Sequence, residues 1–441
     1  MSKNIQIIAI ILSICISCSS EPEINIKASI SKYNLANEIN EKIGKEHFFQ
    51  DQAMKNINPR LGKALIKQLD SQKIYFTKNE ILYFTNKFQS SADDVEIATS
   101  YELINLYFNR LIEATKYQIK VIQKKDFDFS EVENILIDND LQEFRETNLD
   151  LREIWVKLAK NDVLTSMLTD KSEDEAIELI SKRYKNRLRR ISQRNEEDIF
   201  SMVMNNLTGL FDPHSSYMSP KSAEDFEMTM SLNLEGIGAL LTTEDDYPII
   251  VSVVPGGPAE KSGKINPDDK IVKVRQIKKV EVDSVDVVGW RIDEVVQLIR
   301  GEAGTQLELE IIPAKTEDLS DRKWVLLTRE EVKLEEQAAK FLIVDSAQGE
   351  DNFKIGIIDL PAFYIDFNAW RDKDPDFRSS SKDVEDILNK FKLANVDAVI
   401  VDLRGNSGGS LYEANKLTGL FVSSGPTLQV KESNGDIRPW G

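Results

Sequence analysis

The sequence predicts a multidomain protein in which an all-α domain precedes a small, mostly-β domain and an incomplete α/β domain. Three observations lead to this order. Residues 63–208 contain neither Gly nor Pro, so helices can form there, whereas strands joined by tight turns can hardly form. Glycine becomes frequent in residues 229–315, beside runs of β-branched residues. Residues 354–403 then read as a strand, a helix and a second strand, the pattern of a βαβ unit.

The helical domain is assigned to residues 31–228. Within it, apolar side chains recur at the i, i+3, i+4, i+7 spacing of one helix face at Ile104, Tyr107, Phe108 and Leu111. The many charged residues of this domain fit solvated helix faces. No motif in it points to a particular chemistry.

The mostly-β domain is assigned to residues 229–315. One helix interrupts its strands, because apolar residues return to helix spacing in residues 292–299 and Gly301 follows at the position of a C-cap. Alternation of apolar and polar residues then predicts a half-buried strand around Leu309.

The third domain is assigned to residues 316–441. Strands are predicted at residues 354–360 and 396–403 with a helix between them, and a helix at 411–422 and an extended piece at 427–430 follow. A compact α/β domain would normally continue beyond these elements, so we expect the chain to be a fragment.

The N-terminus predicts export. Lys3 precedes an apolar run, Ile5–Ile16, that is too short to span a bilayer but has the length of a secretory signal. A small residue then precedes Cys18, which resembles a bacterial lipoprotein cleavage site with Cys18 as the acylated residue. We assign residues 1–18 to a signal peptide and residues 19–30 to a linker, with plain signal cleavage as the alternative.

Charge and composition exclude several classes of function. The chain has 56 basic and 74 acidic residues, a formal net charge of −18, and no basic stripe, which argues against a nucleic-acid partner. Only two Cys and two His occur, too few for a zinc or iron–sulfur site built from nitrogen and sulfur ligands. We therefore expect no metal and no cofactor.

A glycine-rich turn gives the clearest chemical signal. Residues 405–409 satisfy G-x-S-x-G between a predicted strand and a predicted helix, the context of a hydrolase nucleophile elbow. That interpretation needs a histidine after Ser407, but His47 and His214 both precede it, so Ser407 is a weak candidate. The turn could instead expose backbone N–H groups to an oxyanion, or be a plain glycine turn. A phosphate-binding loop is disfavoured because the Walker lysine is missing.

A second glycine loop, Gly236-Ile237-Gly238, leads into an apolar strand. A peptide could add as an extra strand between this strand and the helix at 292–299, with its terminal carboxylate bound by the loop amides. A hairpin corner would explain the same glycines, so the loop alone is a weak signal.

Short motifs follow one another along the chain in a fixed order. They are Leu69–Phe76, Asp212–Pro220, Leu234–Ala239, Gly256–Ala259, Gly289–Arg291 and Val401–Gly409. In this order they resemble the tail-specific protease, or carboxyl-terminal processing peptidase, family in its long periplasmic form with a helical N-terminal domain and a PDZ domain. The resemblance covers nearly the whole chain after the signal.

This resemblance implies a fold and an activity. Residues 229–315 would be a PDZ domain that captures apolar C-terminal tails of exported proteins, with Gly236, Ile237 and Gly238 at the tail's carboxylate. The following domain would be a serine endopeptidase with a Ser–Lys dyad, in which Gly409, with Gly408 beside it, donates to the oxyanion. An adaptor protein could deliver substrates, and the lipid anchor would make the protein a membrane-anchored lipoprotein of the periplasm.

The sequence departs from this family in its catalytic residues. Neither the serine motif, resembling S-A-S-A-S-E, nor a G-K-G-like lysine segment occurs in residues 1–441. We therefore assign no nucleophile and no base, and expect this chain by itself to be inactive. A natural, non-catalytic PDZ protein that binds tails is the alternative. Asp268 stands where the family usually has Gly, and Ser71 where it usually has Pro; the change at 268 should affect a turn more than the activity.

Overall fold

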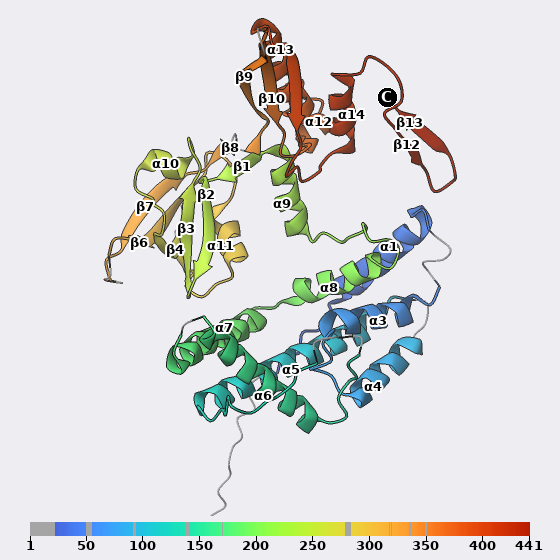
Figure 1. Cartoon of the computed structure of the whole chain (residues 1–441), viewed down its shortest axis with the longest axis vertical. Coiled ribbons are helices and arrows are strands. Elements are labelled where there is room, and N and C mark those ends of the chain that lie inside the picture. Colours follow the sequence, from blue (N-terminus) through green and yellow to red (C-terminus); the bar gives the residue numbers. More distant parts are fainter. Residues whose placement is uncertain are drawn as a thin grey trace, which may run out of the picture. The chain divides into compact units, whose positions relative to one another are not determined.

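The computed structural model describes residues 23–441 except 50–54, 91–93, 137–138, 140, 170, 278–283, 317, 319, 335–336 and 349–350. The expected signal peptide and Cys18 lie outside the described residues. The chain divides into two compact units, Met1–Tyr217 and Met218–Gly441 (Figure 1). None of the helices in the described ranges is both long and apolar enough to cross a membrane.

Helices build the first unit, as the segment without Gly and Pro predicts. They are α1 (Ile30–Glu46), α3 (Ile57–Leu69), α4 (Lys78–Gln89), α5 (Ile97–Gln123), α6 (Asn148–Met167), α7 (Glu173–Ser192) and α8 (Glu196–Thr208). α4, α6, α7 and α8 begin at capping boxes, in which an Asn, Ser or Thr side chain accepts the N–H of the third helical residue, whose own side chain reaches back. The sequence thus fixes where these helices begin.

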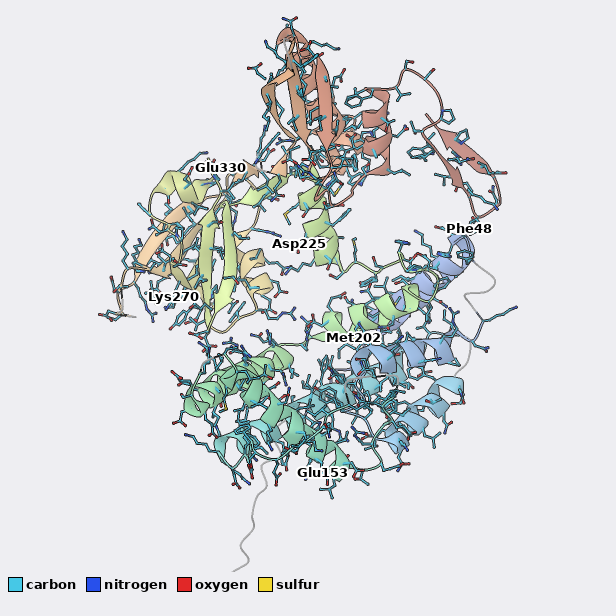
Figure 2. All side chains as sticks on the ribbon, viewed as in Figure 1. Phe48, Glu153, Met202, Asp225, Lys270 and Glu330 are labelled. Atoms are coloured by element: carbon cyan, nitrogen blue, oxygen red, sulfur yellow. The ribbon has the colours of Figure 1, made fainter. Side chains whose placement is uncertain are left out.

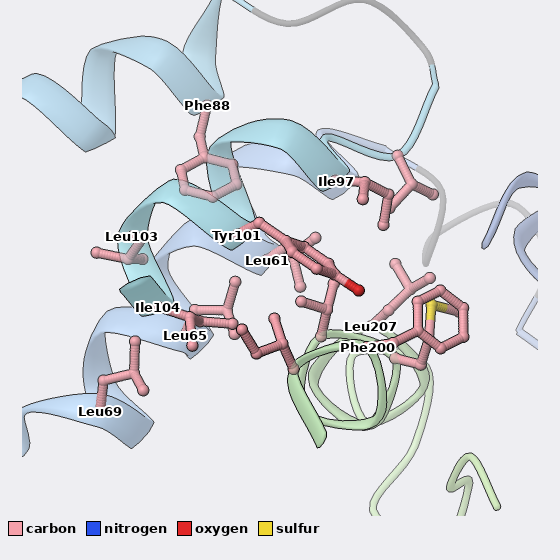
Figure 3. Close-up of a cluster of buried hydrophobic side chains, with 14 of the residues drawn as sticks. Leu61, Leu65, Leu69, Phe88, Ile97, Tyr101, Leu103, Ile104, Phe200 and Leu207 are labelled. Carbon is pink, nitrogen blue, oxygen red and sulfur yellow. The ribbon is translucent and has the colours of Figure 1, made fainter. Parts of the chain in front are cut away.

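The main core of this unit takes buried side chains from α1, α3, α4, α5, α7 and α8. Leu61 and Leu65 of α3, Ile104 of α5, and Phe200 and Leu207 of α8 are fully buried in one cluster (Figure 3). The apolar stripe predicted on α5 faces this cluster, with two of its side chains buried and two partly buried. Burial of each such side chain contributes about 1.5–3 kcal/mol, so α5 is fixed along its length by its apolar face.

The second unit begins with α9 (Pro220–Ser231) and continues into the expected β domain. This domain contains β1 (Asn233–Gly236), β2 (Ala239–Glu244), β3 (Tyr247–Val253), α10 (Pro258–Ser262), β4 (Lys270–Ile277), β5 (Ser284–Asp286), α11 (Ile292–Ile299), β6 (Gln306–Ile312), β7 (Lys323–Thr328) and β8 (Glu330–Lys333). Its antiparallel main sheet has the order β2–β3–β4–β6–β7, with β5 beside β4. The helix predicted at 292–299 is α11, and its C-cap is Arg300, one residue before Gly301.

The two ends of the β domain lie side by side. β1, where the chain enters, pairs antiparallel with β8, where it leaves, and Gly236 lies opposite Glu330, which is labelled in Figure 2. The loop after Gly236, one of the two predicted sites, is therefore attached to a paired strand rather than to a free chain end.

The remaining chain forms an α/β domain. It contains β9 (Lys340–Gln348), β10 (Asp351–Asp359), α12 (Phe367–Arg371), α13 (Ser380–Leu393), β11 (Ala398–Asp402), α14 (Leu411–Gly419), β12 (Leu428–Lys431) and β13 (Ile437–Trp440). β10 and β11 pair in parallel with Ile357 opposite Ile400, which confirms the predicted βαβ unit. β9 pairs antiparallel with β10, so the sheet is mixed. α14 ends at Gly419, before the end predicted at residue 422.

Gly62→Ala should destabilise the helical unit, although Ala is the better helix former. Gly62 lies in α3, where a Cβ would come within 2.4 Å of the ring of Phe88, and overpacking of a core costs roughly 1–3 kcal/mol. Hydrogen exchange of the α3 amides in urea would show the lower stability. Lys63→Ala, at the exposed neighbouring position, is the control, and equal stability of the two variants would contradict the packing argument.

Candidate functional site

The glycine-rich turn lies between the end of β11 and the start of α14, as predicted. Gly405, Gly408 and Gly409 have φ angles of +78°, +89° and +139°, a region that residues with side chains rarely adopt. Gly409 also has no space for a side chain, because a Cβ there would come within 2.4 Å of the carbonyl oxygen of Phe363. Both the backbone angle and the close approach therefore require glycine at 409.

The N–H groups of this turn differ in whether they donate a hydrogen bond within the protein. The Gly409 N–H has no acceptor among the described residues, and Gly409 itself is exposed at the N-terminal end of α14. The three amides around it donate to protein acceptors: Ser407 to the carbonyl of Pro361 (3.0 Å), Gly408 to Asn406 Oδ1 (2.8 Å) and Ser410 to the carbonyl of Phe363 (2.8 Å). One free N–H at a helix N-terminus can receive a negatively charged oxygen.

Asn406 holds the turn in this shape. Its Nδ2 donates to the carbonyl of Leu360, just after β10, and its Oδ1 accepts the Gly408 N–H, both at 2.8 Å. Of the two amides predicted to donate to an oxyanion, that of Gly408 is therefore engaged and that of Gly409 is free. We assigned no role to Asn406 from the sequence, although Asn side chains often hydrogen-bond the backbone two residues further on.

Glu413 fixes the first turn of α14 against α13. Its side chain is fully buried, and Oε2 accepts the N–H of Ser381 at 2.7 Å and the hydroxyl of Ser380 at 3.1 Å. The carboxylate thus caps the N-terminus of α13, where negative charge is favoured by the helix dipole. The glycine turn, which ends where α14 begins, is held in place by this contact.

Asp402 and Arg404 form an ion pair at the entrance to the turn. Asp402 accepts the backbone N–H of Arg404 at 3.0 Å and a guanidinium N–H at 2.7 Å. These hydrogen bonds lower the pKa of Asp402 to about 2. No group of three or more His, Cys, Asp and Glu side chains in the part of the chain that the structure describes could hold a metal ion.

Ser407 lacks the surroundings of an activated nucleophile. Its hydroxyl lies 3.5 Å from the carbonyl oxygen of Pro361, and no basic side chain contacts it within the described residues. His47 belongs to the helical unit, where Nε2 lies 2.7 Å from Asp212 Oδ2 and Nδ1 accepts the N–H of Phe49 at 3.0 Å. Both ring nitrogens of His47 are therefore engaged within the helical unit, and the role of Ser407 stays a hypothesis.

The second predicted site, residues 236–238, joins β1 to β2. The carbonyl of Ile237 accepts the N–H of Ala259, and that of Gly238 accepts the N–H of Val254, both at 2.8 Å. The N–H groups of Ile237 and Gly238 have no acceptor in the described ranges. The loop therefore presents two adjacent free amides, a suitable receptor for a terminal carboxylate.

The strand that follows this loop has a free edge. β2 pairs with β3 on one side only in the described sheet, and α11 packs against it. Ile237 is buried in the domain core, whereas Leu240 of β2 is 58% exposed. An edge strand with free N–H groups at its start and an exposed apolar side chain is suited to binding an extended, apolar peptide.

Asp268 occupies a turn with the backbone of a glycine. Its φ is +67°, in the left-handed region that Asp tolerates better than most residues. Its N–H donates to the carbonyl of Ile250 at 2.7 Å. The turn thus accommodates Asp in place of the usual Gly, and its effect on activity stays a prediction.

Comparison with protein families identifies three domains along the chain. Residues 39–221 match the tail-specific protease N-terminal domain, residues 226–312 a PDZ domain, and residues 354–439 peptidase family S41. This order confirms the predicted fold class and the family resemblance. The domain boundaries drawn from the sequence and the assigned site residues stay predictions.

Curated relatives extend the similarity to nearly the whole chain. The chain is 32% identical to the tail-specific protease of Haemophilus influenzae over 453 residues, which cover 99% of this chain and 62% of that protein. It is 29% identical to the carboxy-terminal processing protease CtpA of Bacillus subtilis, over 62% of this chain and 52% of that protein. The chain therefore spans less than two thirds of the length of these relatives.

Solved structures match parts of the chain. The PDZ domain of a carboxy-terminal protease from Vibrio cholerae, solved in complex with a peptide, is 44% identical, and the match covers 23% of this chain and 99% of that one with a TM-score of 0.21. A photosystem II D1 C-terminal processing protease is 19% identical over 58% of this chain and 64% of that one, with a TM-score of 0.26.

Gly409→Ala should distort the turn, since it adds a Cβ both at a positive φ and against the carbonyl of Phe363. We expect a loss of stability of roughly 1–3 kcal/mol in the α/β domain, measured by hydrogen exchange of the α14 amides. Gly405→Ala is the control, because its φ is also positive but its Cβ would meet no atom within 4 Å. A Gly409 variant as stable as the Gly405 variant would contradict this account.

The contact between Asp402 and Arg404 should persist into acidic solution. The pKa of Asp402 falls from the ordinary 3.8 to about 2, so its contribution to the turn is present above the ordinary value and is lost only as the pH falls toward about 2. An NMR titration of the Asp402 carboxyl carbon measures this midpoint. Arg404→Gln should return it toward 3.8; a midpoint near that value in the unchanged chain would disprove the assignment.

Proposed function

The chain belongs to the tail-specific protease family, whose N-terminal, PDZ and S41 peptidase domains it contains in that order, and on this premise we propose that it serves in processing exported proteins at their C-terminal tails. The PDZ domain captures an apolar tail, and the S41 domain is part of a serine endopeptidase that cleaves the captured protein. The observation that supports this most directly is the pair of free N–H groups at Ile237 and Gly238 beside edge strand β2.

Tail capture follows from the chemistry of this loop. The terminal carboxylate of a substrate accepts the N–H groups of Ile237 and Gly238, with Gly236 allowing close approach, and the preceding residues pair with β2. Hydrogen bonds to an ionised acceptor are roughly twice as strong as neutral ones, so the free carboxylate distinguishes a chain end from an internal segment. The exposed Leu240 contacts apolar side chains of the tail.

The peptidase step uses the glycine turn. The Gly409 N–H stabilises the oxyanion formed when a serine attacks the scissile amide, and one such donor contributes roughly 10²–10³ in rate. By family resemblance the serine works with a lysine, whose pKa must be lowered by burial or positive charge. Neither motif occurs in residues 1–441, so this chain by itself binds tails without cleaving them.

The expected place of action is the periplasm. The apolar run Ile5–Ile16 directs export, and acylation of Cys18 anchors the chain to a membrane. Exported proteins with apolar C-terminal tails are the partners, with an adaptor as a further partner by family resemblance.

A second candidate function is that of a non-catalytic tail-binding protein. The PDZ loop and the edge strand β2 support it equally, because tail binding needs neither a nucleophile nor a base. The two functions share the PDZ site and differ only in whether a tail, once bound, is cleaved.

The PDZ loop should bind a peptide that ends in three apolar residues with a free carboxylate. Isothermal titration calorimetry should show binding that weakens at least about tenfold when the carboxylate is amidated, since two charge-assisted hydrogen bonds are lost. Gly238→Ala should also weaken it, because a Cβ there approaches Gly257 and Val332. Gly263→Ala is the matched control, with a similar φ of +60° and nothing within 4 Å of its Cβ.

Equal affinity for the acid and the amide would refute tail capture. Mass spectrometry of the incubated mixture tests the peptidase step separately: no cleavage is expected from residues 1–441. Turnover of the peptide by this chain, abolished in Ser407→Ala, would instead make Ser407 the nucleophile.

A further inference from the structure

A short irregular segment before the first helix packs on the helical unit. In residues 23–28 every second side chain is partly buried against the main core, namely Ile24, Ile26 and Ala28, while the residues between them are exposed. This period of two is that of a strand with one buried face. The segment falls within the stretch that the sequence analysis assigned to a linker, residues 19–30.

Two asparagines of α5 bind the backbone of this segment. Asn109 accepts the N–H of Ile24 at 2.8 Å and donates to its carbonyl at 2.9 Å. Asn105 accepts the N–H of Ile26 at 3.1 Å and donates to its carbonyl at 2.8 Å. Each carboxamide therefore pairs with one residue as a neighbouring strand would, using one donor and one acceptor.

The spacing of the two asparagines matches that of the segment. Positions i and i+4 on a helix are separated by a rise of about 6 Å, and positions i and i+2 on a strand by about 6.6 Å. Since the carboxamides bind the backbone, they fix the direction and register of the segment, and the apolar core binds its alternate side chains.

The segment is also attached at its other end. The N–H of Ser29 donates to Glu196 Oε1 of α8 at 2.6 Å, and Lys32 in the first turn of α1 forms an ion pair with Glu197. The chain is therefore held to the helical unit continuously from Ile24 into α1.

We propose that Asn105 and Asn109 form a docking site for the chain's own N-terminal segment, and that this docking keeps the helical unit close to the lipid surface to which Cys18 is anchored. The membrane part of this inference rests on the proposed acylation of Cys18. A chain spans at most about 3.3–3.6 Å per residue, so docking at Ile24 limits the tether from Cys18 to about 20 Å. Release of the segment up to Ile30 would double that reach to about 40 Å.

The first experiment tests the docking alone, on the chain without lipid. In Asn105→Asp/Asn109→Asp the side chains keep an acceptor but lose their N–H donors and place negative charge against two carbonyl oxygens. The amides of Ile24 and Ile26 should then exchange with solvent at least about tenfold faster. Asn148→Asp, the same change at an exposed position of α6, should leave them unchanged. Unaltered exchange in the double variant would overturn the docking site.

The second experiment measures the tether on the acylated chain bound to phosphatidylcholine vesicles. No Cys follows Cys18, so Asn34→Cys, at an exposed position of α1, accepts a single dye, and energy transfer to a headgroup acceptor reports its distance from the lipid. The transfer efficiency should fall in the double Asp variant, while exchange of the α3 amides stays unchanged. Equal efficiency in both chains would overturn the tether.

A separate measurement tests the proposed anchoring. Mass spectrometry that finds no lipid on Cys18 would refute the membrane part, whereas the exchange experiment would still decide the docking site. Cys18→Ser should release the chain from the vesicles and leave the protection of the Ile24 and Ile26 amides intact; loss of that protection would count against docking by Asn105 and Asn109.

Discussion

Backbone N–H groups that folding leaves without an acceptor are the feature on which both candidate sites depend. Backbone N–H groups are almost always paired in folded proteins, so an amide without an acceptor is available to a ligand. Gly409 is exposed, whereas Ile237 and Gly238 are buried. In the PDZ loop the carbonyls of Ile237 and Gly238 accept the N–H groups of Ala259 and Val254, while the N–H groups of Ile237 and Gly238 have no acceptor in the described ranges. Because the Ile237 carbonyl and the Gly238 N–H belong to one peptide unit, the hydrogen bond from Ala259 fixes the direction of that donor.

The glycine turn also contains an N–H group without an acceptor, but different contacts hold it in place. There the amides on both sides of Gly409 donate to protein acceptors, one of them the side chain of Asn406, and Glu413 fixes the helix that follows. In the peptidase step proposed above, a developing negative charge would therefore meet an oriented donor without rearrangement of the chain. Preorganisation of this kind is the main source of oxyanion stabilisation in enzymes.

The sequence predicted the elements better than the contacts between them. Hydrophobic periodicity located α5, α11 and the parallel pair β10–β11 because each pattern is local, and the missing glycines and prolines marked the helical unit. Asn105, Asn406 and Glu413 were not identified, since each binds a segment that no periodic pattern connects to it: Asn105 reaches Ile26, and Glu413 reaches Ser381. Gly301 was placed at the C-cap, yet α11 ends so that Arg300 takes that position, because composition marks the end of a helix only to within a residue or two.

The turn at 405–409 shows why a motif alone does not define a site. A strand, a glycine turn and a helix can present either the side chain of the third residue, as in a nucleophile elbow, or a backbone amide two residues later. Both arrangements fit the same G-x-S-x-G sequence. The order of the histidines along the chain argued only against the nucleophile elbow. The hydrogen bonds bear on both: the Ser407 hydroxyl lies 3.5 Å from the Pro361 carbonyl with no basic partner among the described residues, whereas the Gly409 N–H has no acceptor there. The chemistry available to this turn therefore depends on which of its N–H groups already donate hydrogen bonds within the protein.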